Sequence, residues 1–164
     1  MTSNVIVLNS KDKKIIRKYL ESQFGINKLP EGIFFCFSKK DNVYFSNRNV
    51  FEEDQYLLRV KTFGLMFGTY TKNGFRLSIE GSQLVGPNAS KNILELQDSE
   101  RDLWISGNSL IIDKNKLNNQ EIILKHKNDF FGTAFVKEGL VKNTLAKSRL
   151  IKTIFEENII EDKS

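Results

Sequence analysis

Side chains that could carry covalent or metal chemistry are scarce in this sequence. His126 is the only histidine and Cys36 is the only cysteine, and the two lie far apart along the chain. A disulfide framework and a cysteine zinc site both need several such residues, so both are excluded within one chain. His126 stands between two lysines, and we expect it to be an exposed strand residue. Cys36 lies in an apolar run, where a core thiol is expected.

An acidic cluster, Glu52-Glu53-Asp54, is the other possible source of acid–base chemistry. It falls in the segment 48–60, whose mixed periodicity we interpret as a short helix. Acidic residues near a helix start are explained by the helix dipole alone. The sequence contains no P-loop and no G-x-G-x-x-G, H-E-x-x-H or G-x-S-x-G motif. We therefore expect a protein that is not an enzyme and that uses no cofactor and no metal.

Positive charge is the feature best suited to binding a ligand. The chain carries a net charge of +5, and the stretch from Lys114 to Lys152 holds nine basic residues but only three acidic ones. Acidic segments flank this stretch on both sides. A basic stretch of this kind can bind phosphate groups. A lysine-coated face exposed to solvent would explain the same composition.

Length and composition are those of an ordinary globular protein. The 164 residues are 40% hydrophobic and 27% charged, which suits one medium domain or two small ones. No apolar run approaches the roughly 18–20 residues that span a bilayer. The first residues lack the cleavage site of a signal peptide, so we expect an intracellular protein with no membrane partner.

Two kinds of element are predicted in the first half. Ser10 is the predicted N-cap of a helix that runs to about Gln23, with Gly25 as its stop. The runs 32–38 and 42–46 flank a polar turn and predict a β-hairpin. The apolar face of the helix would hold four residues: Ile15, Ile16, Tyr19 and Leu20.

The stretch FGTYTKNGFRLSIEG, residues 67–81, contains the clearest hairpin signal. Its Asn-Gly pair at 73–74 favours a tight turn because both residues tolerate positive φ. Arg76 lies between two apolar residues, so its side chain should point to the opposite face from theirs. We expect the turn to present Lys72 and Arg76 outward, where solvation alone would explain both cations.

A Gly-Pro break within residues 81–90 is the best candidate for a domain boundary, which predicts domains at 1–90 and 91–164. After it, a strand at 92–97 and a helix with an acidic first turn precede several short strands. Gly132 is expected at a bulge or tight contact, and Trp104 in the core. The terminal run LAKSRLIKTIF is strand or helix. This half predicts a small β-barrel.

The second half resembles a PUA domain, an RNA-binding module of pseudouridine synthases and archaeosine transglycosylases. The resemblance rests on NILELQ, SERDLWISGN, SLIID and D-FFGTAF. Together with FGTYTKNGFRLSI and LVGPNAS, these segments resemble the Nip-seven family of ribosome biogenesis factors over essentially the whole chain. The resemblance implies an α+β fold, in which an N-terminal antiparallel sheet with helices precedes a PUA-like β-barrel.

The same resemblance implies a function without catalysis. Family members bind pre-ribosomal RNA during assembly of the large subunit and contact other assembly proteins, with no small-molecule substrate. The expected location is cytoplasmic in an archaeal-type cell and nucleolar in a eukaryotic one. Two alternatives remain open, namely a protein-interaction scaffold and an accessory subunit of an RNA-modification enzyme.

Candidate RNA contacts come from the basic run KSRLIK. The resemblance assigns Lys147, Arg149 and Lys152 to this role. Ser148 and Phe155 stand where archaeal relatives tend to have basic residues, so other lysines would have to compensate. Arg149 and Lys152 would share a face in a helix but not in a strand. The remaining candidates are Lys137 and Lys142 and, as secondary ones in the hairpin, Lys72 and Arg76.

Overall fold

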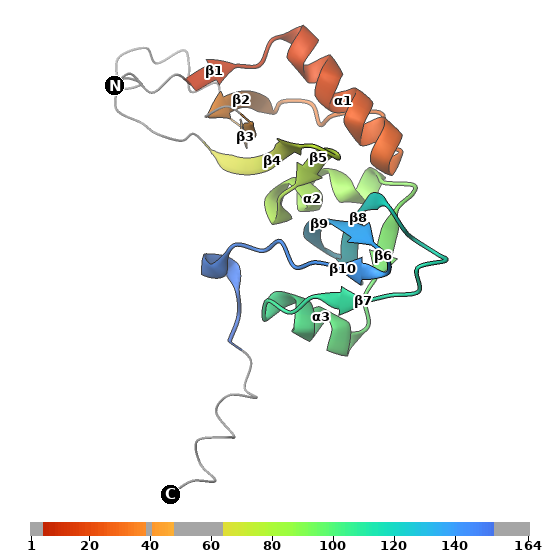
Figure 1. The fold of residues 1–164 in the computed structure, drawn as a ribbon. Coiled ribbons are helices and arrows are strands. Elements are labelled where there is room, and N and C mark those ends of the chain that lie inside the picture. Colours follow the sequence, from red (N-terminus) through yellow and green to blue (C-terminus); the bar gives the residue numbers. More distant parts are fainter. Residues whose placement is uncertain (1–4, 39–40, 48–63, 153–164) are drawn as a thin grey trace, which may run out of the picture.

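The computed structural model describes residues 5–38, 41–47 and 64–152, and its fold is mixed α+β (Figure 1). The predicted helix at 48–60, its acidic cluster and Phe155 lie outside the described residues. The strands of these residues form two five-stranded sheets. The first contains, in spatial order, β1 (Val5–Val7), β2 (Phe34–Ser38), β3 (Asn42–Ser46), β4 (Leu65–Thr71) and β5 (Gly74–Leu77). The second contains β6 (Ile93–Glu95), β8 (Gln120–His126), β9 (Asp129–Lys137), β10 (Leu140–Val141) and β7 (Leu110–Ile111).

Helix α1 (Ser10–Phe24) covers the first sheet. Its cap is Asn9 and not Ser10, because the Asn9 side chain accepts hydrogen bonds from the backbone N–H groups of Lys11 and Asp12 at 2.8 and 3.0 Å. Asp12 returns a bond to the Asn9 N–H and completes a capping box. Gly25 ends the helix with φ 70°, as predicted.

The apolar face of α1 is only partly as predicted. Ile16, Leu20 and Phe24, spaced four residues apart, are fully buried. Ile15 and Tyr19 lie beside this stripe and remain 41% and 37% exposed, so their assignment to the buried face was wrong. Phe24 was the face residue that the prediction missed, because the helix was expected to end one residue earlier.

Both predicted hairpins of the first half are present. Strands β2 and β3 pair from Phe34↔Ser46 to Ser38↔Asn42, and β4 and β5 pair up to Thr71↔Gly74. Gly74 has φ 129°, whereas Asn73 keeps negative φ, so the second turn needs only one residue with positive φ.

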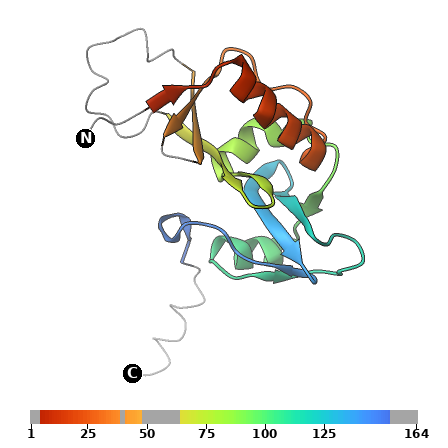
Figure 2. The same ribbon diagram turned by 45° about the horizontal axis from the view of Figure 1, so that its top comes forward.

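The second sheet is mixed and curls into a half-barrel (Figure 2). Its β6–β8 pair is parallel and its other pairs are antiparallel. Gly132 has φ 84° and sits where the register between β8 and β9 shifts, so the predicted bulge is confirmed. Helix α3 (Asp98–Ile105) packs its buried Trp104 into this half.

The two sheets share one hydrophobic core through α2 (Ile79–Val85). The core of the first sheet includes Val85 of α2 and also Ile123 and Phe130 from the second sheet. A second cluster around Trp104 lies wholly within the half-barrel. A Cβ on Gly81 would lie 1.9 Å from the carbonyl oxygen of Phe67, so α2 lies directly on β4. Apolar side chains from before and after residue 90 therefore pack together in the described structure.

Candidate nucleic-acid interface

The basic run KSRLIK forms a short 3-10 helix, η3 (Lys147–Arg149), followed by extended backbone, and so is neither a regular strand nor an α-helix. Its backbone is held by two local bonds, from Arg149 N–H to Ala146 O at 2.8 Å and from Leu150 N–H to Lys147 O at 3.3 Å. The Ile151 N–H donates to Ile105 O of α3 at 2.9 Å, which ties the run to the end of that helix. Lys147, Arg149 and Lys152 all remain exposed.

Arg149 points back toward the first half of the chain. Its guanidinium forms an ion pair with Glu80 of α2. Arg149 is about half exposed, whereas the Glu80 side chain is only 18% exposed. The pair lies at a cavity of about 320 Å³ that both residues line. Arg76, the secondary candidate from the hairpin, lines the same cavity. Two arginines that are 73 positions apart in sequence are thereby brought to one site.

Arg76 does not point outward as predicted. Its Nε donates to Glu121 Oε1 on β8 at 2.7 Å, and its side chain is 29% exposed. The alternation with Phe75 and Leu77 is confirmed, since both of these are buried on the other face. The second sheet covers the face that was expected to meet solvent, so Arg76 is held between the sheets.

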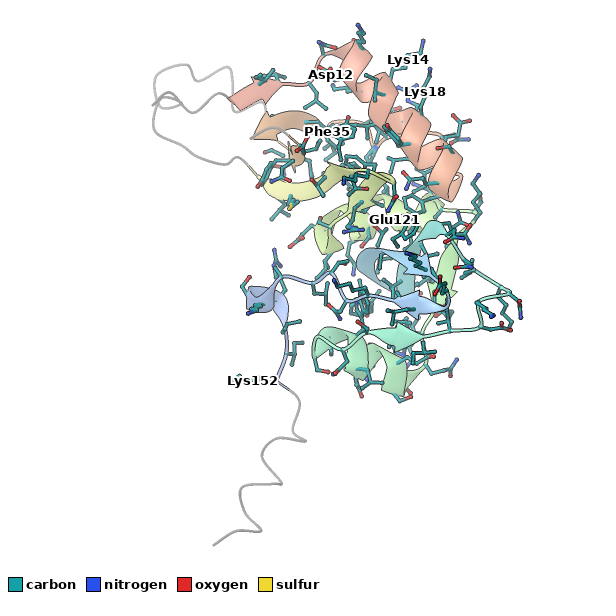
Figure 3. The ribbon with its side chains drawn as sticks, in the orientation of Figure 1. Asp12, Lys14, Lys18, Phe35, Glu121 and Lys152 are labelled. Atoms are coloured by element: carbon teal, nitrogen blue, oxygen red, sulfur yellow. The ribbon has the colours of Figure 1, made fainter. Side chains whose placement is uncertain are left out.

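Glu121 is a buried carboxylate at the junction between the sheets (Figure 3). Burial raises its pKa above the ordinary value, although the hydrogen bond and charge of Arg76 and the hydroxyl of Thr133 act in the opposite direction. Oε1 accepts from Arg76 and from Thr133 Oγ1 at 3.5 Å. Oε2 is buried and has no hydrogen-bond partner among the described residues. This carboxylate is therefore stabilised mainly by a single arginine.

Further hydrogen bonds hold β9 against the first half. Leu77 N–H donates to Thr133 Oγ1 at 3.0 Å, and Gly132 N–H donates to Ser82 Oγ at 2.8 Å. Gln83 Nε2 donates to Phe130 O at 3.1 Å. These bonds hold together the walls of the cavity that come from β5, α2 and β9, and residues 144–149 form a further wall.

The other predicted contacts do not join this site. Lys137 ends β9 and Lys142 follows β10, and the chain then crosses the molecule before reaching η3 (Figure 1). Lys72 is exposed in the turn between β4 and β5. Lys137, Lys142 and Lys72 are exposed but separate from Arg149 and Arg76.

A second concentration of positive charge, which was not among the predicted contacts, lies on α1. Five cations fall within eight residues there, and Lys14 and Lys18 lie one turn apart on its outer face (Figure 3). None of the five makes an ion pair with another described residue. The run KDKKIIRK carried this signal. None of these five cations lines the cavity beside η3.

His126 is buried, so the prediction that it is exposed was wrong. Only 6% of the residue is accessible, and its Nε2 lies 2.8 Å from Asp98 Oδ1 at the start of α3. The pair explains the burial, because a buried imidazole needs a hydrogen-bond partner. Bonding to His126 is the main reason that the pKa of Asp98 is lowered. No hydroxyl or thiol of the described ranges bonds to His126, so the pair is not part of a nucleophilic triad there.

Metal ligation finds no support in the part of the chain that the structure describes. No group of three or more histidine, cysteine or acidic side chains is placed there to hold an ion. Cys36 is buried as predicted, and burial raises the pKa of its thiol to about 11. No helix within residues 5–38, 41–47 and 64–152 could cross a bilayer.

The sequence has no match among the protein families and curated proteins compared with it. The arrangement at η3 offers two exposed lysines and an accessible guanidinium beside a cavity with a second guanidinium. Guanidinium groups bind phosphate bidentately and lysines add attraction that does not depend on sequence, so an anionic polymer suits this surface.

Proposed function

We propose that this protein binds RNA without catalysing a reaction, and that it acts as a ribosome biogenesis factor of the Nip-seven type. The observation that carries the proposal is the site itself. Arg149 and Arg76, from the two halves of the chain, line one cavity, and Lys147 and Lys152, close to Arg149 in sequence, are exposed. Arg76 is already paired with Glu121, so the cations offered to a ligand are the half-exposed Arg149 and the exposed lysines near it in sequence.

The fold supports the same proposal. The resemblance implies a PUA-like barrel in the second half, and the second sheet curls into a half-barrel covered by α3. The basic run emerges from this half-barrel and bonds to the end of α3. The proposed ligand is pre-ribosomal RNA during large-subunit assembly, and the proposed partners are other assembly proteins in the cytoplasm or nucleolus.

Fluorescence anisotropy with a labelled single-stranded RNA tests RNA binding. The variant Arg149→Ala/Lys152→Ala removes two cations from the proposed surface. Lys14→Ala/Lys18→Ala removes two cations from α1, far from Lys152 in Figure 3, and is the charge-matched control. Each variant is first checked for native secondary structure by circular dichroism.

Salt dependence separates a phosphate-binding site from a general charge effect. Log affinity falls as log salt rises, and losing two phosphate contacts should make this fall less steep by about 1.4, measured between about 50 and about 200 mM salt. We expect this change only in the η3 variant. Lys147→Ala/Lys152→Ala keeps the Arg149–Glu80 ion pair and serves if Arg149→Ala/Lys152→Ala does not fold.

Three results would contradict the proposal in different ways. Equal losses in the η3 and α1 variants would mean that charge alone governs binding. An unchanged η3 variant would exclude this surface as the site. The absence of salt-sensitive binding by the wild type would exclude RNA binding and would favour the interaction scaffold.

A further inference from the structure

The cavity beside η3 has the size of a small-molecule site. Its volume of about 320 Å³ is at the lower end of the range of about 300–1,000 Å³ that ligand pockets occupy. Its walls come from both halves of the chain: Met66, Leu77 and Ile79 on one side, and Gly132, Thr144 and Leu145 on the other. A space of this size suits one planar group with its sugar and not a stretch of polymer.

The walls combine apolar surface with a few hydroxyl groups. Thr69 Oγ1 donates to Asp41 O and Thr144 Oγ1 donates to Thr133 O, each at 3.1 Å. Since each hydroxyl proton is used, the two oxygens keep lone pairs that can accept from an amino or imino group. Mostly apolar walls with a few fixed polar groups are typical of pockets for flat heterocycles.

The charged pair at the cavity adds a second feature. Arg149 and Glu80 both line the space, and the less exposed member is the carboxylate. A phosphate that approached Arg149 would meet the negative charge of Glu80 and would have to replace it as the partner of the guanidinium. Glu80 therefore competes with any anionic ligand for this arginine.

We propose that this cavity takes one unpaired nucleotide of an RNA, with the base between the two sheets and its phosphate at Arg149. The inference rests on the proposed RNA binding and specifies the form of RNA at that site. Unpaired bases can turn out of a strand into a protein pocket, where apolar side chains and guanidinium planes pack on them. A fully paired helix could contact the lysines of η3 but could not fill the cavity.

Two RNA hairpins test this inference by fluorescence anisotropy, one fully paired and one with a single-nucleotide bulge. We expect the wild type to bind the bulged hairpin about tenfold more tightly, because packing one base on protein side chains contributes at least about that much to affinity. Ala146 lines the cavity, and its backbone is extended. A larger side chain at this position can therefore fill the space without removing a charge.

Ala146→Phe is the blocking variant and Ala146→Ser is its matched control. The blocking variant should bind both hairpins with the affinity that the wild type has for the paired one, and the control should keep the preference. A wild type without preference, or a blocking variant that keeps it, would overturn the inference while leaving RNA binding intact. A wild type that binds neither hairpin would overturn the proposed function as well.

Glu80→Gln tests the competition at Arg149 in the same assay. Removing the carboxylate charge should raise the affinity for the bulged hairpin at least about threefold, because the phosphate no longer displaces an ion pair. Unchanged or weaker binding would overturn this role of Glu80. The melting temperatures of the variants, measured beforehand, show whether each one is folded under the assay conditions.

Discussion

The Nε of Arg76 lies 2.7 Å from Oε1 of Glu121 and thereby joins the hairpin of the first sheet to a central strand of the second. The two residues are 45 positions apart, and the carboxylate has an exposed fraction of only 1%. Thr133 shares the same carboxylate oxygen and also accepts the backbone N–H of Leu77. The pair and its neighbours therefore hold the wall of the cavity that both halves of the chain form.

Arg76→Ala should lower the free energy of unfolding by about 3 kcal/mol, because removing one partner leaves an uncompensated buried charge. Urea unfolding followed by circular dichroism measures the loss. Lys28→Ala is the control: its ion pair with Glu31 is exposed on both sides, and such pairs contribute at most about 1 kcal/mol. Equal losses in the two variants would show that Arg76 has no structural role at the junction.

Because of this role, Arg76 is a poor choice for testing RNA contact. A loss of binding in Arg76→Ala could follow from a changed junction as well as from a lost contact. Arg149 and the two exposed lysines around it can be substituted with less effect on the core, since about half of Arg149 is exposed. Substitutions of those three residues therefore test RNA contact more directly than Arg76→Ala does.

Glu121→Gln should change how stability depends on pH. Burial raises the pKa of Glu121 in the folded protein above the ordinary 4.5, so the folded state takes up a proton before the unfolded state does. The wild type should therefore gain stability relative to Glu121→Gln as the pH falls from neutrality toward 4.5. Below the unfolded pKa the difference should be constant.

The slope of that difference has an upper limit of about 1.4 kcal/mol per pH unit, because one proton is involved. Urea unfolding of both proteins at a series of pH values measures it. Taking the difference between the two proteins removes the titrations that they share. A difference that stays flat, or that shrinks as the pH falls, would contradict a raised pKa for Glu121.

Local signals in the sequence were enough to predict most elements around the site. Gly25 ends α1 and Gly132 lies at a bulge, because each needs a backbone conformation that other residues rarely adopt. The hairpin at 65–77 follows from its Asn-Gly turn and two β-rich runs. The exposure of Lys147 and Lys152 was also within reach of sequence reasoning, since lysine is almost never fully buried.

Pairs that are distant in sequence explain most of what was missed. Arg76 forms an ion pair with Glu121, and Arg149 forms one with Glu80. Neither pairing can be predicted from composition or periodicity. His126 is buried because Asp98, 28 positions away, accepts its hydrogen bond. The cavity could not be predicted from the sequence for the same reason, because its walls become neighbours only when the two sheets pack together through α2.

The shared core predicts that the two halves unfold together. Ile123 and Phe130 of the second sheet belong to the core of the first, so separating the halves would expose apolar surface on both. Cys36 reports on the first sheet and Trp104 on the half-barrel, and each is the only residue of its type in the chain. Both are buried.

Thiol alkylation and tryptophan fluorescence, followed across one urea series, test this directly. With burial raising the pKa of Cys36 to about 11, only about 0.1% of the native thiol is ionised near pH 8. An unfolded thiol with a pKa of 9.0 is about one tenth ionised there, so alkylation should become about 100-fold faster on unfolding. A single transition requires the same urea midpoint from Cys36 labelling and from Trp104 emission. An earlier midpoint for either probe would show that its half opens first, and that the ion pair and shared core at the junction do not couple the two sheets.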